Sequence, residues 1–246
     1  MTPAVIDLHE LTVSVAGRCV LDRVTVTVTE RRLGVIGPNG SGKSTLARVL
    51  GGLTTPTSGS VRVVGIDPAR NGREARSRIG FCFADPDAQI VMPTVREDVD
   101  FSLRRSGLDR ATRAARVSTA LHRFGLSHLA DAPAHRLSSG EKQLLALAAS
   151  LVREPELLIC DEPTTLLDLR NARAMAGVLW GLTEDGHPDT PWGSPDPPAL
   201  VVVSHDLDLV RECDRVLRLE DGVLVDDGTP DEVIGSYRED MARQST

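Results

Sequence analysis

Residues 33–50 read LGVIGPNGSGKSTLARVL, an apolar stretch, a glycine-rich loop and a helical pattern in direct succession. Within this stretch, residues 37–45 (GPNGSGKST) match the phosphate-binding loop pattern G-x-x-x-x-G-K-[ST]. The glycines allow successive backbone N–H groups to converge on one anion, and a helix that starts near Lys43 points its positive end at the same place. Because the motif lies between a strand and a helix, we expect the chain to bind a nucleoside triphosphate.

The loop supplies most of the predicted nucleotide contacts. Lys43 is expected to reach the β- and γ-phosphates as a catalytic residue, and the Ser44 hydroxyl is placed to bind Mg²⁺. The residues predicted to bind the nucleotide are Gly37, Pro38, Asn39, Gly40, Ser41, Gly42, Lys43, Ser44 and Thr45.

Two further apolar runs end in polar side chains. Residues 157–160 (LLIC) precede Asp161 and Glu162, and residues 200–203 (LVVV) precede Ser204 and His205. Fully apolar runs are typical of parallel strands buried on both faces, and ligands gather at the carboxyl ends of such strands. We therefore predict that Asp161 holds Mg²⁺, that Glu162 polarises the attacking water, and that His205 hydrogen-bonds the γ-phosphate.

The remaining pattern predicts an α/β fold. Alternating valines in the first 36 residues predict antiparallel strands joined by a turn at Gly17-Arg18. Helical spacing covers residues 98–105, 110–124 and 143–152. The expected architecture is a phosphate-loop NTPase core with a mostly parallel sheet, an N-terminal antiparallel β subdomain and an inserted α-helical subdomain.

We expect a single domain over residues 1–246. Its α/β core comprises about 1–84 and 154–246, and the helical subdomain comprises about 85–153. The segment 184–198 is rich in Pro, Gly and Asp and is predicted to be a flexible loop. The C-terminal part is predicted to form a hairpin around Asp221-Gly222, followed by a helix.

Composition excludes several classes of protein. The chain has 35 acidic and 28 basic residues, a net charge of −7 and 3% aromatic residues, which argues against nucleic-acid binding. No apolar run approaches the roughly 18 residues of a membrane span, and the first residues lack signal-peptide features. The four cysteines form no C-x-x-C pair, so neither a zinc site nor a disulfide framework is expected. Only two of the 28 cations are lysines, Lys43 and Lys142.

Residues 137–141 (LSSGE) and the helical pattern after them resemble the LSGGQ signature of the nucleotide-binding subunits of ABC transporters. In that family the signature of one subunit closes over ATP bound to another, so the resemblance implies a homodimer or heterodimer of ATPase subunits. It assigns the signature to Ser138, Ser139, Gly140 and Glu141, and the D-loop to Asp168. No N-K-x-D guanine motif is present, so ATP is the expected nucleotide.

A narrower resemblance concerns residues 85–101, DPDAQIVMPTVREDVDF. They are similar to the NPDDQ…PTVxEDVxF stretch of ATPases from energy-coupling-factor (ECF) importers, with the biotin type most similar and the cobalt or nickel type next. This resemblance implies a membrane-embedded transport component and a substrate-binding membrane subunit as partners. It also implies a location at the cytoplasmic face of the membrane and a partner-docking region near Gln89. A plain surface loop and helix over 85–101 is the alternative.

Four positions depart from the family pattern. Ala84 stands where the family usually has the Q-loop glutamine. Val15 stands where an aromatic residue usually stacks on adenine, so we expect Val15 to bind the nucleotide base by aliphatic packing. Ser139 and Glu141 replace the middle glycine and the final glutamine of the signature. These departures leave two alternatives to a transport ATPase: an ABC ATPase outside transport, or a catalytically impaired subunit paired with an active one.

Overall fold

A three-stranded antiparallel sheet forms one edge of the molecule in the computed structural model, which describes residues 5–183 and 197–244. Its strands are β1 (Ile6–Val15), β2 (Arg18–Val28) and β4 (Ser58–Val63), in the order β2-β1-β4. The tight turn between β1 and β2 is Ala16-Gly17, both at positive φ (49° and 80°), as a two-residue hairpin turn requires. The turn predicted at Gly17-Arg18 was one residue too late, because Arg18 already pairs with Val15.

The second sheet has six strands in the order β5-β6-β7-β3-β8-β9. Strands β5 (Ile79–Cys82), β6 (Leu157–Asp161), β7 (Ala199–Val203), β3 (Arg32–Ile36) and β8 (Arg215–Glu220) run parallel, and β9 (Val223–Gly228) is antiparallel to β8. Every residue of β6 and β7 is buried, as their apolar runs predict. The predicted α/β class with a mostly parallel sheet is confirmed.

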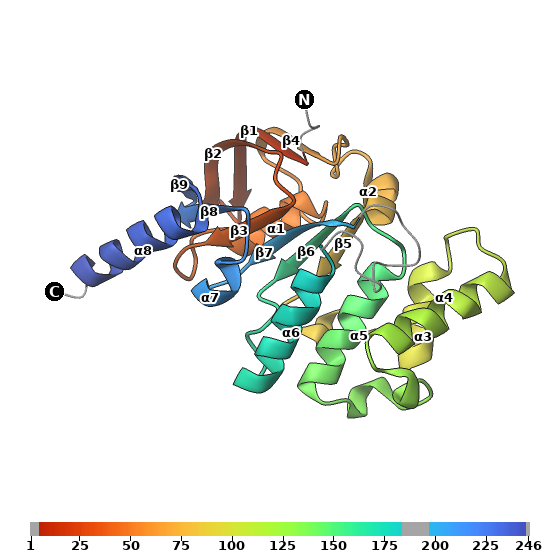
Figure 1. The fold of residues 1–246 in the computed structure, drawn as a ribbon. Helices are drawn as coiled ribbons and strands as arrows, with labels where there is room; N and C mark the ends of the chain where they lie inside the picture. Colours follow the sequence, from red (N-terminus) through yellow and green to blue (C-terminus); the bar gives the residue numbers. More distant parts are fainter. Residues whose placement is uncertain (1–4, 184–196, 245–246) are drawn as a thin grey trace.

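Helices α3 (Val95–Leu103), α4 (Arg110–Arg123) and α5 (Ser139–Leu151) group together on the side of this sheet away from β1 and β2 (Figure 1). Two of them begin earlier than the spacing predicts, and in both cases a hydroxyl residue caps the helix. The Thr94 side chain accepts from the N–H of Glu97 at the start of α3, and the Ser138 side chain accepts from the N–H of Glu141 at the start of α5. The predicted helical insertion is therefore present, with α3 starting at 95 and α5 at 139.

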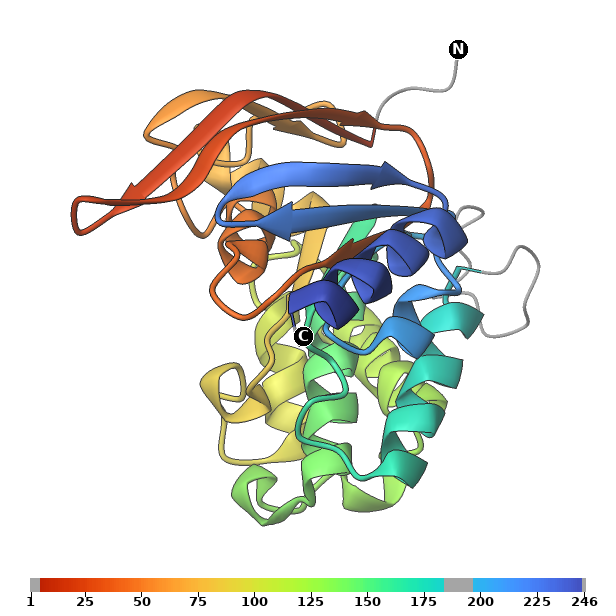
Figure 2. The ribbon, with the colours of Figure 1, turned by 90° about the vertical axis from the view of Figure 1, so that its left-hand side faces the viewer.

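Five further helices complete the described fold: α1 (Lys43–Leu50), α2 (Gly72–Arg78), α6 (Leu169–Gly181), α7 (Leu207–Val210) and α8 (Pro230–Gln244). The C-terminal hairpin turns at Asp221-Gly222 as predicted, and α8 runs alongside β8 and β9 (Figure 2). The short elements β4, α2 and β5 had no clear sequence pattern and were not predicted individually. Of the loop predicted at 184–198, residues 184–196 lie outside the described part of the chain.

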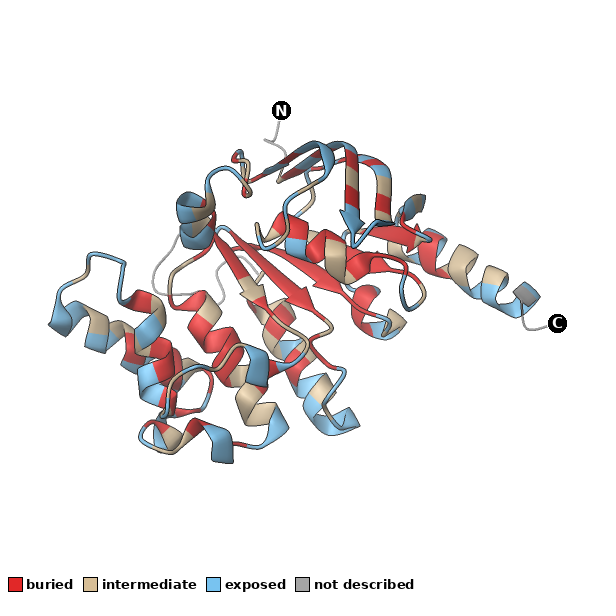
Figure 3. Cartoon of the chain, turned by 180° about the vertical axis from the view of Figure 1, so that it is seen from behind, coloured by how far each residue is buried: buried red, intermediate tan, exposed pale blue. Residues whose placement is uncertain are grey.

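The buried side chains lie on both faces of the six-stranded sheet (Figure 3). Along β6, Leu157 and Ile159 join the cluster shared with α1 and the N-terminal sheet, whereas Leu158 and Cys160 join the cluster under α3 to α6. Because alternate residues of β6 pack into both clusters, the strand is held in place, and so are the residues at its carboxyl end. Over residues 5–183 and 197–244, the structure contains no helix that is both long and apolar enough to span a bilayer.

Candidate active site

A cavity of about 290 Å³ lies between the loop after β3 and the carboxyl end of β6. Its lining is formed by Val20, Asn39, Gly40, Gly42, Lys43, Ser44, Thr45 and Glu162. The fold thus brings Glu162 next to a loop that lies more than a hundred positions earlier in the sequence. This arrangement is the one predicted from the ends of parallel strands.

The shape of the loop depends on glycine at two positions. Gly37 has φ +144°, and a Cβ there would lie 2.0 Å from the carbonyl oxygen of Leu219. Gly42 caps α1 with φ +100°, and a Cβ there would lie 2.8 Å from the carbonyl oxygen of Val20. Side chains are therefore excluded at both positions, which lets the loop pack between β8 and β2.

Lys43 is buried at the floor of the cavity, with 6% of its surface exposed. Its ammonium donates to the carbonyl oxygens of Gly37 (2.8 Å) and Pro38 (2.9 Å). Burial lowers the pKa of Lys43, and the nearby carboxylates of Glu162 and Asp161 oppose that shift. A phosphate would offer this partly desolvated cation charged acceptors in place of neutral carbonyl oxygens.

Ser44 and Asp161 meet directly, with the Ser44 hydroxyl donating to Asp161 Oδ1 at 2.9 Å. Asp161 is 3% exposed, and burial raises its pKa, while the hydrogen bond from Ser44 opposes the rise. A buried carboxylate beside a hydroxyl offers the oxygen ligands that Mg²⁺ prefers, and a cation there would offset the cost of burying the charge. The two residues predicted for the metal therefore fit Mg²⁺.

Glu162 and His205 also contact each other. Glu162 Oε2 lies 2.8 Å from His205 Nδ1 and accepts from the Thr165 hydroxyl at 3.0 Å. Glu162 has a positive φ of 53°, an uncommon conformation for a glutamate, and its N–H donates to the carbonyl of Val203 at 2.8 Å. The end of β7 thus holds Glu162 beside the cavity, where its carboxylate can accept a proton from water.

The signature residues start helix α5 as a capping box. Glu141 Oε2 accepts from the Ser138 N–H (2.8 Å) and from the Ser138 hydroxyl (2.7 Å). These hydrogen bonds hold the pKa of Glu141 below its usual value, and the bond from the Ser138 hydroxyl has the largest effect. Glu141 therefore keeps its negative charge. Its carboxylate accepts the hydrogen bond from the Ser138 hydroxyl, the group that the resemblance assigns to binding the nucleotide of a second subunit.

The signature and the predicted D-loop lie side by side. A Cβ at Gly140 would come within 3.4 Å of the Asn171 side chain, and Asn171 donates to Asp168 from its backbone N–H (2.8 Å) and its side chain (3.0 Å). Ser138, Ser139, Gly140, Glu141 and Asp168 do not line the 290 Å³ cavity. This placement agrees with a role toward the nucleotide of another subunit.

Gln89 makes hydrogen bonds within the chain. Its Oε1 accepts from the Phe83 N–H (3.2 Å), and its Nε2 donates to Ala146 O and Ser150 Oγ (both 2.9 Å). Gln89 thus ties the segment after β5 to the signature helix, and any contribution to partner docking comes through the shape of that segment. Its docking role stays a prediction.

Two residues near Gln89 were not predicted to act here. Asp98 is buried and accepts from the N–H groups of Val91 (2.9 Å) and Met92 (3.0 Å), and burial raises its pKa. Lys142, whose role the sequence left open, forms an ion pair with Asp87 at 2.7 Å. In the sequence, these contacts are indicated only by the presence of acidic residues in 85–101, which include Asp87 and Asp98.

The prediction that Val15 contacts the adenine base stays a prediction. Val15 is 54% exposed at the end of β1 and does not line the cavity, whereas Val20 does. A second cavity beside the loop is lined by Arg18, Cys19, Val20, Gly40 and Asp221. The start of β2 is therefore closer to the phosphate loop than the residue predicted from the family alignment.

Comparisons with known proteins agree with this site. The family described as ABC transporter matches residues 21–165. The biotin transport ATP-binding protein BioM of Rhizobium etli is 42% identical, over 92% of this chain and 95% of its own length. The energy-coupling factor transporter ATP-binding protein EcfA of Methanoculleus marisnigri is 40% identical, over 87% of this chain and 74% of its own.

Among solved structures, cbiO1 from Clostridium perfringens, described as part of the ABC transporter complex cbiONQ, superimposes with a TM-score of 0.80. It is 31% identical, over 95% of this chain and 92% of its own. Together with the loop, the two strand-end carboxylates and the signature, these matches establish the family. The chain belongs to the ABC transporter family and is an ATP-binding, ATP-hydrolysing subunit of that family.

Proposed function

We propose that this chain is the ATPase of an ECF-type importer at the cytoplasmic face of the membrane, and that the imported substrate is biotin. The observation that carries the proposal is the 85–101 segment, whose sequence is similar to that of ECF ATPases and which is bound to the signature helix by Gln89 and Lys142. The likeness to BioM and EcfA supports the same conclusion. A transition-metal ion is the second substrate candidate, which the likeness to cbiO1 favours.

Hydrolysis follows from the site geometry. The loop N–H groups and Lys43 hold the phosphates, and Glu162 accepts a proton from the water that attacks the γ-phosphate. In the tautomer with the proton on Nδ1, His205 donates to Glu162 at 2.8 Å and orients that carboxylate. In the tautomer with the proton on Nε2, it can instead donate to the γ-phosphate. Ser44 and Asp161 would hold Mg²⁺, which when bound neutralises charge on the β- and γ-phosphates.

The active form in this proposal is a pair of copies of the chain. Each copy carries a complete phosphate loop, Asp161, Glu162 and His205, together with its own signature at the start of α5. A pair in which each signature faces the other copy's loop would contain two competent sites. The signature does not line the cavity of its own chain, which supports a second subunit that completes each site.

The route from nucleotide to membrane partner runs through the contacts between 85–92 and α5. Gln89 binds Ala146 and Ser150, and Asp87 binds Lys142, directly after the signature. Asp98 holds the backbone of Val91 and Met92. A displacement of the signature helix on closure over ATP would therefore carry the 85–92 segment with it.

The proposal is tested by uptake of labelled biotin in cells that lack their own importer and that express this chain with ECF-type membrane components. We expect uptake that disappears with Glu162→Gln. Uptake of cobalt or nickel ions but not biotin would contradict the biotin assignment. Failure of the chain to associate with any of those membrane components would contradict the importer assignment.

Ala84→Gln is expected to raise ATPase activity. The alanine has no polar group, whereas a glutamine can hydrogen-bond the attacking water or a Mg²⁺ ligand. One hydrogen bond to a charged partner predicts a gain of roughly tenfold in turnover. The measurement is phosphate release by the complex with its membrane component, with Ala114→Gln, at an exposed position on α4, as the matched control. An unchanged or lower rate for Ala84→Gln would refute the expectation.

Lys142→Ala is expected to weaken coupling without unfolding the protein. The ion pair with Asp87 is largely exposed on the Asp87 side, so the free energy of unfolding should change by less than about 1 kcal/mol. Stimulation of ATPase activity by the membrane component should fall by roughly two- to thirtyfold, which corresponds to coupling terms of about 0.5–2 kcal/mol.

The matched control for this experiment is Arg243→Ala, which removes an exposed ion pair with Glu239 on α8, outside the 85–101 segment. It should leave the stimulation unchanged. Equal stimulation of the Lys142→Ala variant and the wild type would show that the Lys142–Asp87 contact carries no coupling.

A catalytically impaired subunit is the second candidate function. The observation that favours it is the hydrogen bond from the Ser138 hydroxyl to the Glu141 carboxylate at 2.7 Å, which engages the hydroxyl that would otherwise bind the partner's nucleotide. Under this alternative the purified chain binds ATP but hydrolyses it only beside a different, active ATPase subunit. Steady hydrolysis by the chain with its membrane component alone would exclude it.

A further inference from the structure

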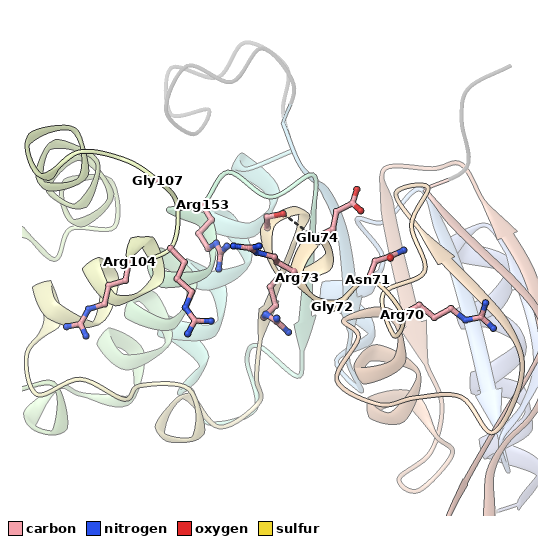
Figure 4. A pocket seen from close by; sticks show the side chains of 11 residues that line it. Arg70, Asn71, Gly72, Arg73, Glu74, Arg104, Gly107 and Arg153 are labelled. Carbon is pink, nitrogen blue, oxygen red and sulfur yellow. Dashed lines mark hydrogen bonds between the residues drawn. The ribbon is translucent and has the colours of Figure 1, made fainter.

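A row of arginines lines a cavity of about 1080 Å³ where α2 meets the helical group (Figure 4). In Figure 4, Arg104 lies at one end of the row, Arg70 at the other, and Arg73 and Arg153 between them. The complete lining is Arg70, Asn71, Gly72, Arg73, Glu74, Arg76, Ser77, Arg104, Arg105, Gly107 and Arg153. Three separate segments of the chain therefore contribute positive charge to one cavity of a net acidic protein.

Most of this charge is not neutralised by the protein. The lining's only carboxylate, Glu74, accepts from Arg78 at 3.1 Å, and Arg70 pairs with Asp67 at 3.4 Å. Within residues 5–183 and 197–244, no ion pair involves the other five arginines, which are Arg73, Arg76, Arg104, Arg105 and Arg153. Arginines elsewhere, such as Arg32, Arg215 and Arg218, are paired with carboxylates.

Two of the unpaired guanidiniums, those of Arg76 and Arg153, repel each other. Burial lowers the pKa of Arg153, and the charge of Arg76 lowers it further, which places these two side chains within electrostatic reach. An anion between them would remove this repulsion and regain hydrogen bonds to both. The cavity is therefore electrostatically complementary to a bound polyanion.

The lining also restricts the kind of anion. It contains guanidinium, amide and hydroxyl groups and the Glu74 carboxylate, but no aliphatic or aromatic side chain. A docked protein segment would need apolar contacts at the centre of its interface, and a nucleobase would need a stacking surface. A phosphate group presents several charged oxygens and can accept bidentate hydrogen bonds from more than one guanidinium.

We propose that this cavity is a binding site for a ligand with clustered phosphate groups, separate from the ATP site. Arg78 directly precedes β5, and Arg153 lies four residues before β6, so the cavity is at the amino ends of these strands. Asp161 and Glu162 lie at the carboxyl end of β6, the opposite end. A ligand here would bridge α2 to the turn after α3 and to the end of α5, and would brace the core against the helical group.

The test is a titration of the purified chain with tripolyphosphate. A Lys43→Ala background weakens binding at the phosphate loop, so that the remaining signal reports the arginine cavity. We expect saturable binding that falls at least about tenfold in Arg76→Ala/Arg153→Ala and weakens as salt is raised. Arg76→Lys should lose part of the affinity, because lysine keeps the charge but loses the guanidinium fork. Arg238→Ala, an exposed arginine on α8, is the control and should bind as the background does.

A second arm distinguishes the source of the phosphates. Sedimentation with vesicles of phosphatidylglycerol and phosphatidylcholine tests a lipid headgroup, and arginine-dependent binding to either probe supports the proposal. Binding of neither probe would overturn it, as would binding that the arginine substitutions leave unchanged in variants with wild-type circular dichroism. Polyglutamate that binds as tightly as tripolyphosphate would overturn the phosphate assignment.

Discussion

Glu162→Gln is expected to abolish steady ATP hydrolysis and to leave ATP binding intact. Glutamine preserves the size of the side chain and an oxygen that can accept from Thr165, but it cannot take a proton from water. Loss of a general base costs about 10²- to 10⁴-fold in rate. The measurements are phosphate release under steady-state conditions and the dissociation constant for ATP.

The matched control for Glu162→Gln is Glu156→Gln. Glu156 directly precedes the same strand, β6, at its other end, where it pairs with Arg78 at 2.6 Å, far from the phosphate loop. This variant should hydrolyse ATP at nearly the wild-type rate. Steady hydrolysis by Glu162→Gln would show that another group activates the water.

Lys43→Ala is expected to weaken ATP binding by roughly ten- to a hundredfold. Lys43 is 6% exposed, and its ammonium would exchange two carbonyl partners for phosphate oxygens. Hydrogen bonds that involve a charged group contribute about 1.5–3 kcal/mol, which gives this range. Titration calorimetry with ATP measures the change directly.

The chain offers a natural control, because its only other lysine is Lys142. Lys142→Ala removes a cation that pairs with Asp87 outside the cavity and should leave ATP affinity unchanged. Lys43→Arg should not restore binding, because a planar guanidinium is too bulky for the position of a compact ammonium. Wild-type affinity in Lys43→Ala would contradict the assigned role of the lysine.

The residues around the nucleotide could be predicted because each lies at the end of a strong local pattern. The glycine loop has a fixed motif, and two fully apolar runs mark buried parallel strands, so Lys43, Asp161, Glu162 and His205 follow from position alone. The hydrogen bonds of Ser44 with Asp161 and of Glu162 with His205 agree with that expectation. Polar residues that follow apolar runs can be predicted to lie close together, because parallel strands place their carboxyl ends at one edge of the sheet.

Contacts between side chains distant in sequence could not be predicted in this way. Nothing in the local sequence indicates that Lys142 pairs with Asp87, or that Gln89 binds the carbonyl of Ala146, because both depend on how the 85–92 segment folds against α5. The direction of the Glu141 side chain was equally open. It depends on a capping interaction with Ser138 that competes with other conformations of the helix start.

Short, polar elements were also missed. Strand β4 and helix α2 carry few apolar residues, and in α2 only Ala75 is buried. Their positions are set by pairing with β1 and by the connection to β5, which are tertiary effects that override local propensity. The arginine cavity depends on α2 and therefore could not be inferred from the sequence.

The claim that each active site is shared between two copies of the chain can be tested by mixing two inactive variants. Lys43→Ala weakens ATP binding and removes the catalytic ammonium. Gly140→Asp places a negative charge in the signature, at a position where the nearest atoms, those of Asn171, are 3.4 Å or more from a Cβ. A mixed pair would contain one site built from an intact loop and an intact signature. If pairing is random, the equimolar mixture with the membrane component should recover about a quarter of the wild-type rate, while each variant alone stays inactive. No recovery in the mixture, or full activity of Gly140→Asp alone, would contradict the shared site.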